Sequence, residues 1–483
     1  MLRQGGSAVD AAVAAGFAAA VAEPGLSSLG GGGFLLVRTP DGSEHLLDFF
    51  VDAPGSGLVG ADTEPHFVAV PVRFAGAVQE FHAGWGSVAV PGCFDGYLTA
   101  HRRWGRLPLA AVVEPARRMA LDGVVLDPAQ AALLEMLEQI FSMSPDGRAV
   151  VAPRGRLLRA GDRVRNPLLG EFLGGVAAGR LGGFADPAVA GPLTEAMRAG
   201  GGLLTPYDLQ RYRVVERSPL VGSYAGTRLA TNPAPSFGGG LVVWALGELD
   251  RAAGAARAPG TGGADVAVLA EVLVRMSQRH RGLAAGTLAE PTVTDTALEC
   301  SAAGGGAQAG PGPLTSRGTT HVSAVDADGG VAAMTTSNGS CSGCFVPGTG
   351  IQLNNVMGEL DLHPGGFHST PPGVRIGSMM APTVVITADG GVVGLGSGGS
   401  ERIRSALACV LHDLVAGGMP LADAVLAPRM HWDRERLQVE PGLDEEALRR
   451  LEDRWPVNTW PARDLYFGGV HAVRRAPSGE VAA

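Results

Sequence analysis

The chain has 483 residues, of which 46% are hydrophobic, 18% are charged and 73 are glycine, so it can bury a large core and does not have the composition of a disordered protein. Its 38 Lys and Arg residues against 47 Asp and Glu residues give a net charge of −9, and no basic stripe interleaved with aromatic residues is visible. This charge pattern argues against nucleic acid as a partner.

The sequence predicts a soluble, cytoplasmic protein without disulfide bonds. No segment reaches the roughly 18 uncharged apolar residues that a membrane-spanning helix needs. The N-terminal stretch "MLRQGGSAVD" lacks the apolar run and cleavage site of a secretory signal. Five cysteines, an odd number scattered along a long chain, indicate no disulfide framework.

The N-terminal region predicts one helix followed by a β-hairpin. Ser7 is a suitable N-cap for an alanine-rich helix that runs to about Glu23, where a proline and a glycine stop it. A glycine run at 30–33 then leads into the apolar segment 34–39. Residues 44–51, "EHLLDFFV", have the character of its hairpin partner.

The remainder changes from helical to β character. Apolar residues spaced three and four apart recur from about 91 to 254, which predicts a mainly helical middle region, and 264–284 is its last strong helix. Residues 302–318 are rich in glycine and proline and predict a flexible linker. Beyond it, strand-like segments flank turns at 328–330 and 389–390, and a helical segment follows the second hairpin.

Three short motifs have both a functional and a structural interpretation. The glycine run at 30–33 follows a helix and opens a strand, the reverse of a phosphate-binding loop, so a tight turn is favoured. Cys341 and Cys344 have redox or zinc spacing, but no further ligands at suitable spacing accompany them, and we predict no metal site. The segment 394–403, "GLGSGGSERI", places backbone amides just before a helix, where they suit an oxyanion, although alone it indicates only a turn.

Thr319 is the most informative position. A threonine hydroxyl is a weak nucleophile unless a base lies beside it, and a free α-amino group on the same residue can serve as that base. Such an amine arises only if the chain is cut between Gly318 and Thr319, and the glycine-rich linker would leave that bond accessible. On this evidence alone, an ordinary strand start after a surface linker remains the favoured interpretation.

Several motifs occur together in a fixed order: "GGSAVDAAVAAGFAAAVAEPGLSSLGGGGFLLV", "GTTHVSAVDADG", "TTSNG", "PGTGIQLNN", "SMMAPTVV" and "GSGGSERIRSA". In this arrangement the chain resembles the gamma-glutamyltranspeptidase family of N-terminal-nucleophile hydrolases. The resemblance extends from Gly5 to about Glu440. Glycine and alanine richness could imitate one such motif, but not the whole ordered set.

The resemblance implies an α+β protein with a four-layer αββα sandwich. It also implies a precursor that cleaves itself before Thr319, giving a large subunit 1–318 and a small subunit 319–483 that stay associated. Thr319 would then be the catalytic nucleophile, with its own amine carrying the proton. The backbone amides of Gly398 and Gly399 would stabilise the tetrahedral oxyanion.

Other positions match the family's pattern or depart from it. Thr336 matches a second threonine that hydrogen-bonds the nucleophile, and Asn338 and Ser378 match residues that hold the glutamyl head group. Phe50 stands where the family has an arginine that grips the substrate α-carboxylate, and a phenyl ring cannot replace that clamp. Of the two residues that read the α-amino group, one becomes Val356, which cannot accept from an ammonium.

The second residue that reads the substrate α-amino group becomes Glu359, which can still accept from an ammonium. The sequence therefore predicts a self-processing amide hydrolase or acyltransferase with altered substrate recognition, acting on a small-molecule amide or gamma-glutamyl-like substrate and needing no metal or organic cofactor. Two alternatives stay open. One is an enzyme of specialised metabolism that removes an acyl group by cleaving a C–N or C–C bond on the same scaffold. The other is a non-catalytic homologue, against which the intact Thr319, Thr336, Gly398 and Gly399 argue.

Overall fold

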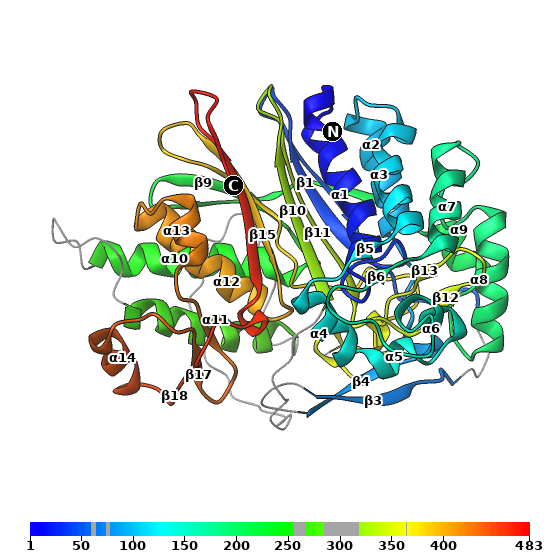
Figure 1. The fold of residues 1–483 in the computed structure, drawn as a ribbon. Coiled ribbons are helices and arrows are strands. Elements are labelled where there is room, and N and C mark those ends of the chain that lie inside the picture. Colours follow the sequence, from blue (N-terminus) through cyan, green and yellow to red (C-terminus); the bar gives the residue numbers. More distant parts are fainter. Residues whose placement is uncertain (59–63, 74–77, 256–265, 285–317, 364) are drawn as a thin grey trace.

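Two antiparallel sheets packed face to face form the centre of the molecule, and helices cover the outer face of each sheet (Figure 1). The computed structural model describes residues 1–58, 64–73, 78–255, 266–284, 318–363 and 365–483. The predicted α+β class and its αββα layering are confirmed.

The first sheet has the strand order β10-β11-β1-β2-β7, formed by Gly318–Val325, Val331–Gly339, Gly32–Arg38, Glu44–Phe49 and Val215–Arg217. The second has the order β20-β19-β15-β14-β9-β8, formed by Val481–Ala482, Gly469–Arg475, Val392–Gly398, Thr383–Ile386, Thr227–Thr231 and Leu220–Tyr224. Smaller sheets pair β3 with β4 (Val68–Arg73, Val78–Ala83), β5 with β6 (Val124–Val125, Arg163–Val164), β12 with β13 (Phe345–Val346, Ile351–Gln352) and join β16, β17 and β18 (Met430–Trp432, Leu437–Val439, Val457–Thr459).

The helices divide into groups that cover opposite sides of the sandwich. The first sheet is covered by α1 (Ala8–Ala22), α2 (Cys93–Trp104) and α3 (Leu109–Asp122). The second sheet is covered by α10 (Phe237–Ala255) and α12 (Arg402–Leu411). The remaining helices are α4 (Pro128–Met136), α5 (Glu138–Phe141), α6 (Pro145–Val151), α7 (Pro167–Ala177), α8 (Pro187–Ala199), α9 (Pro206–Arg211), α11 (Val266–Ala284), α13 (Leu421–Leu426) and α14 (Glu445–Glu452).

Successive side chains of strand β1 point to opposite faces of the sheet and belong to two different hydrophobic cores. Phe34 and Leu36 belong to the cluster that fills the space between the sheets, whereas Leu35 and Val37 belong to the cluster under α1–α3. All four side chains are almost completely buried. A strand with both faces covered reads as a continuous apolar run, which is how residues 34–37 appear in the sequence.

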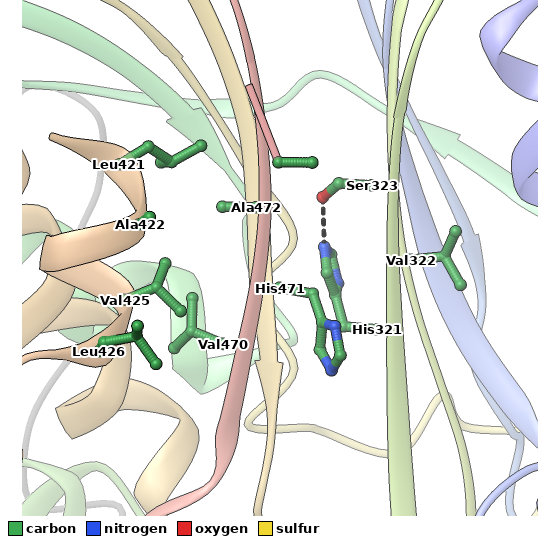
Figure 2. A pocket seen from close by; sticks show the side chains of 11 residues that line it. His321, Val322, Ser323, Leu421, Ala422, Val425, Leu426, Val470, His471 and Ala472 are labelled. Atoms are coloured by element: carbon green, nitrogen blue, oxygen red, sulfur yellow. Dashed lines mark hydrogen bonds between the residues drawn. The ribbon is translucent and has the colours of Figure 1, made fainter. Parts of the chain in front are cut away.

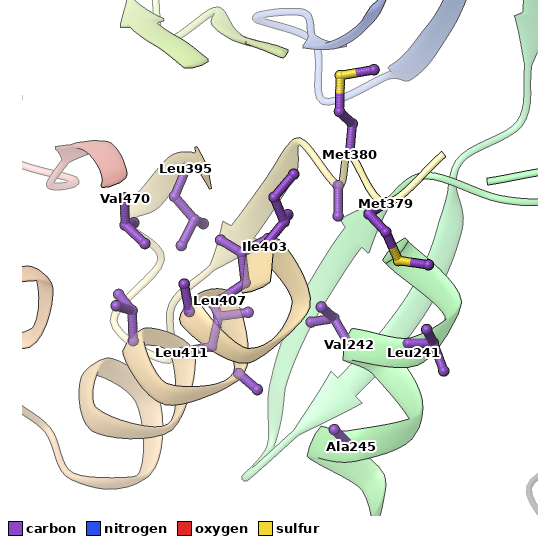
Figure 3. Packing of buried hydrophobic residues seen from close by; sticks show 14 of the residues in the cluster. Leu241, Val242, Ala245, Met379, Met380, Leu395, Ile403, Leu407, Leu411 and Val470 are labelled. Atoms are coloured by element: carbon purple, nitrogen blue, oxygen red, sulfur yellow. The ribbon is translucent and has the colours of Figure 1, made fainter. Parts of the chain in front are cut away.

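The second sheet packs on α10 and α12 through aliphatic side chains (Figure 3). Leu241, Val242 and Ala245 of α10 face Leu407 and its neighbours on α12 across this layer. Above them, Met379 and Met380 lead from the second sheet toward the space between the sheets. This layer therefore connects the outer helices to the segment that holds Ser378.

Most local elements of the sequence analysis are confirmed. Helix α1 begins after Ser7, whose hydroxyl accepts from Asp10 N while the Asp10 carboxylate accepts from Ser7 N at 2.8 Å. The hairpins β1–β2, β10–β11 and β14–β15 all form. The predicted linker differs at its end, because Gly318 already pairs with Gly339 as the first residue of β10, and 302–317 lie outside the described residues.

The mainly helical middle region contains a strand pair that the sequence analysis missed. Strands β8 and β9 form a hairpin whose second strand pairs with β14, so this region supplies one edge of the second sheet. In the described ranges of the chain, no helix is long and apolar enough to cross a membrane. Cys341 and Cys344 are buried free thiols that belong to different hydrophobic clusters.

Candidate active site

Thr319 lies at the start of the edge strand β10, directly after an irregularity in its pairing with β11. Gly318 is opposite Gly339 but Thr319 is opposite Ser337, so a β-bulge separates the two residues of the predicted cleavage site. The Thr319 hydroxyl donates to Ser337 Oγ at 3.4 Å, and Ser337 Oγ donates to the Gly318 carbonyl oxygen at 2.6 Å. One serine hydroxyl thus connects the predicted nucleophile to the carbonyl group that precedes it.

Ser337 is held in this position by a backbone group. The amide of Gly339 donates to Ser337 Oγ at 3.0 Å, which fixes the rotamer of the serine. Sequence reasoning missed Ser337, although the register that places it opposite Thr319 runs unbroken from the hairpin turn. The signal that could have found it is the period-two alternation of β11 counted from the hairpin turn.

The Thr336 hydroxyl is directed to Ser27 and the Thr319 hydroxyl to Ser337, so the structure gives no support to the hydrogen bond expected between the two threonines. Successive residues of a strand point to opposite faces of the sheet, so Thr336 is directed toward the α1–α2 layer. Its hydroxyl lies 3.3 Å from the Ser27 hydroxyl, and only 2% of the residue is exposed. The hydroxyl partner of Thr319 is Ser337.

Gly398 and Gly399 lie between the end of β15 and the start of α12, against the strand that carries Thr319. A Cβ atom on Gly398 would lie 2.4 Å from the Thr319 carbonyl oxygen, so no larger residue fits there. Gly399 has a φ of 120° and Ser400 has a φ of 52°, which turns the chain sharply before the helix. The predicted oxyanion segment is therefore in contact with the predicted nucleophile strand.

A narrow pocket surrounds Thr319. Its volume is about 30 Å³, which is space for only a few water molecules. Four of the predicted site residues line it, namely Thr319, Phe50, Glu359 and Ser378. Its complete lining is Phe50, Thr319, Ser337, Val356, Glu359, Leu362, Ser378, Met379, Met380, Ser400 and Ile403. No lysine, arginine or histidine occurs among these lining residues.

Phe50 forms an apolar wall of this pocket. It is 2% exposed and stacks on Phe34 with ring centroids 5.7 Å apart. Its backbone is fixed at both ends, because its N–H donates to Asp48 Oδ1 at 3.0 Å and its carbonyl accepts from Tyr212 Oη at 2.8 Å. The wall is therefore rigid and part of the core.

Arg375, on the Phe50 side of the pocket, is already paired with carboxylates. Arg375 donates to Asp48 and Asp52 at 2.6 Å each and lies over the ring of Tyr212 at 5.0 Å. Burial raises the pKa of the Asp52 carboxyl, while Arg375 opposes that shift. Arg375 therefore supports the loop around Phe50 and has no free edge for a substrate.

Of the remaining predicted substrate-binding residues, two line the pocket and one lies outside it. Ser378 lies on the pocket, where its hydroxyl accepts from Met380 N at 3.1 Å. Glu359 also lies on it, and a Cβ on Gly339 would come within 2.8 Å of Glu359 Oε1. Asn338 lies outside the pocket, fully buried, with its amide donating to Gln352 Oε1 at 3.2 Å.

A second, larger pocket of about 490 Å³ lies between β10, β19 and α13 (Figure 2). His321 forms part of its wall, and its two ring nitrogens lie 2.7 Å from Thr335 Oγ1 and 2.8 Å from Ser323 Oγ. Burial lowers the pKa of His321 to about 3, so the ring is neutral. Because Thr319 does not line this pocket, the small pocket is the candidate active site.

The αββα sandwich places the chain in the structural class of the N-terminal-nucleophile hydrolases. A cephalosporin acylase from Bacillus halodurans superimposes with a TM-score of 0.78 at 23% identity, over 99% of this chain and 89% of that one. The gamma-glutamyltranspeptidase family model matches residues 1–483, and the chain belongs to that family. It is accordingly a hydrolase or acyltransferase.

Two similar proteins are named for different activities. The chain is 29% identical to the glutathione hydrolase proenzyme of Escherichia coli, over 100% of this chain and 86% of the relative. It is 31% identical to the acylase ACY 1 proenzyme of a Pseudomonas species, over 99% and 88%. Relatives named for hydrolysis and relatives named for acylase activity are thus both similar to this chain.

Replacing Gly398 with alanine should displace the strand that carries Thr319. The new methyl group would lie 2.4 Å from the Thr319 carbonyl oxygen, and such overpacking costs about 1–3 kcal/mol. We expect a lower free energy of unfolding in urea and faster amide hydrogen exchange in β10. Gly247→Ala is the control, because nothing lies within 4 Å of its Cβ; equal stability of the two variants would contradict the close approach.

Proposed function

We propose that the protein is a self-processing amide hydrolase or acyltransferase whose precursor is cleaved between Gly318 and Thr319. The observation that carries the proposal is the hydrogen-bonded chain from the Thr319 hydroxyl through Ser337 to the Gly318 carbonyl oxygen. In this arrangement nucleophile, scissile carbonyl and a donor to its oxygen are adjacent before any cleavage.

Self-cleavage follows from this geometry. The Thr319 oxygen attacks the carbonyl carbon of Gly318, and Ser337 donates to the oxyanion that forms. The hydroxyl proton passes to the Thr319 nitrogen as the C–N bond breaks, which leaves an ester. Water then hydrolyses the ester to a Gly318 carboxylate and a free Thr319 amine.

The two fragments 1–318 and 319–483 would remain associated because each large sheet contains strands of both. In the first sheet β1, β2 and β7 come from the first fragment and β10 and β11 from the second. In the second sheet β9, which also pairs with β8 of its own fragment, pairs with β14 of the other fragment. Separating them would expose the core between the sheets, which is unfavourable.

Catalysis would then use the same groups. The Thr319 amine accepts the hydroxyl proton as the oxygen attacks a substrate amide, and it returns a proton to the leaving amine. The backbone amides of Gly398 and Gly399 stabilise the tetrahedral oxyanion. Water or an acceptor amine releases the acyl group from Thr319. Threonine, its amine and backbone amides suffice for this chemistry without a cofactor.

The acyl group is proposed to differ from gamma-glutamyl. Phe50 supplies an apolar wall where a carboxylate clamp is expected, and no cation lines the pocket. Glu359 can accept from a substrate ammonium, whereas Val356 on the same wall cannot. The similarity to relatives named acylases supports a small-molecule amide with a different acyl part.

Intact mass spectrometry under denaturing conditions tests the self-processing. The wild-type protein should give two fragments, the smaller one beginning at Thr319, and Thr319→Ala should give a single chain because its nucleophile is missing. A Thr319→Ala protein that is still split at this bond would assign the cut to an outside protease. A wild-type chain that stays unbroken after prolonged incubation would contradict self-processing.

Substituting Ser337 with alanine should slow self-cleavage by about 100-fold, the usual effect of removing one oxyanion donor. Thr336→Val is the matched control, because Thr336 is one residue away and its hydroxyl faces Ser27. The half-time of fragment formation, followed by mass spectrometry after a pulse of expression, distinguishes them. A slower Thr336→Val and an unaffected Ser337→Ala would reverse the assignment.

Phe50→Arg should improve the use of gamma-glutamyl substrates. The wild type is expected to hydrolyse gamma-glutamyl-4-nitroanilide with a high KM, and the guanidinium should lower that KM by about tenfold, in keeping with a hydrogen bond to a charged group. Phe50→Leu, which stays apolar, serves as the control. An unchanged KM in Phe50→Arg would place the carboxylate elsewhere in the pocket.

A further inference from the structure

Thr319 lies near the end of an edge strand, where a backbone is only weakly held. In the described part of the chain, β10 pairs within its sheet with one strand, β11. Strand ends and chain termini open locally at little cost in free energy. A reacting group has to stay within about 0.5 Å of its productive position. Other contacts of β10 must therefore hold Thr319 in place.

His321 fastens β10 to β11 beside the nucleophile. It lies two residues after Thr319 and points to the same face of the sheet, into the space between the two sheets (Figure 2). Its ring nitrogens lie 2.7 Å from Thr335 Oγ1 on β11 and 2.8 Å from Ser323 Oγ on β10. Thr335 is opposite His321 in the ladder, as Ser337 is opposite Thr319. The ring therefore fixes the register one pair away from the pair that contains the nucleophile.

The same ring also fits against the second sheet. A Cβ on Gly396 of β15 would lie 2.3 Å from the His321 ring, and a Cβ on Gly398 would lie 2.4 Å from the Thr319 carbonyl oxygen. The two glycines are two residues apart on one strand, so they present the same face to β10. His321 is 4% exposed. Because the ring is closely packed between β10 and β15, it sets their separation next to Thr319.

His321 is a neutral group that does not line the pocket of Thr319. Burial lowers its pKa to about 3, with a smaller contribution from His471, whose ring lies beside it (Figure 2). A neutral imidazole has one donor and one acceptor nitrogen, which suit its two hydroxyl partners. Any effect of His321 on the reaction must therefore come through the position of β10.

We infer that His321 is a positioning residue that holds Thr319 in its reactive place through hydrogen bonds to the neighbouring hydroxyls. Its bond to β11 keeps Thr319 opposite Ser337, and its contact with β15 keeps Thr319 beside the segment 398–399. The inference rests on the proposed function, since it concerns the nucleophile of that same site. Without the ring, β10 can shift, and a misplacement of about 1 Å can slow a reaction about 100-fold.

Chemical rescue tests this role. His321 also lines the pocket of about 490 Å³, so a small molecule in that pocket can reach the position of the ring. In His321→Gly, formation of the two fragments should slow about 100-fold. Imidazole, added at about pH 8 where most of it is neutral, should recover about tenfold of that loss. Thiophene, a five-membered ring without an N–H donor, should recover little.

Two further variants separate positioning from general destabilisation. Val322→Ala removes buried surface from the opposite face of β10 (Figure 2) and should be cut at the wild-type rate. Thr335→Val removes one hydrogen bond of His321 while keeping the shape of the side chain, so its cleavage should be slower than in the wild type. Cleavage of Thr335→Val at the wild-type rate would overturn the inference, even if His321→Gly failed to fold.

Hydrogen exchange distinguishes a failure of this inference from a failure of the proposed function. The amides of residues 319–323 should exchange faster in His321→Gly than in the wild type, and imidazole should slow them again. Equal exchange and equal cleavage in the two proteins would overturn the role of His321, and so would equal rescue by thiophene. An uncut wild-type chain whose exchange still responds to His321→Gly and to imidazole would contradict the proposed function alone.

Discussion

The pairing of β10 with β11 is the constraint on which the candidate site depends. The hairpin register, which runs unbroken from Val325 opposite Val331, places Thr319 opposite Ser337, and the bulge beyond it places Gly318 opposite Gly339. Because side chains alternate along a strand, a shift of one residue would turn Ser337 to the helix side and bring Thr336 to the pocket side. The bulge leaves Asn338 without a pairing partner on β10, and the Gly318 carbonyl accepts from the Ser337 side chain.

Close contact between the two sheets supports this strand from the other side. A Cβ on Gly396 would lie 2.3 Å from the His321 ring, and a Cβ on Gly398 would lie 2.4 Å from the Thr319 carbonyl oxygen. These two glycines of β15 therefore allow a ring and a backbone to fit where any larger residue would separate the sheets. The result is that the segment 398–399 and Thr319 have fixed positions relative to each other, which pre-organises the site.

Sequence reasoning identified the elements whose signals are local. The Ser7 N-cap, the hairpin turns and the ordered motifs each depend on a few neighbouring residues, and all were recognised from the sequence. Strands β8 and β9 were missed because short polar-alternating segments between helices acquire strand structure only by pairing with β14. The roles expected for Thr336 and Asn338 stay predictions; the structure directs the Thr336 hydroxyl to Ser27 and places Asn338 outside the pocket lining, because the face of a strand depends on register.

Counting residues along a motif therefore identifies the site but not which of its adjacent hydroxyls and amides face the nucleophile. Phe50 illustrates the opposite case, since its position on the pocket followed from the motif alone. Its effect could be argued from chemistry before any coordinates, because an apolar ring has no donor for a carboxylate.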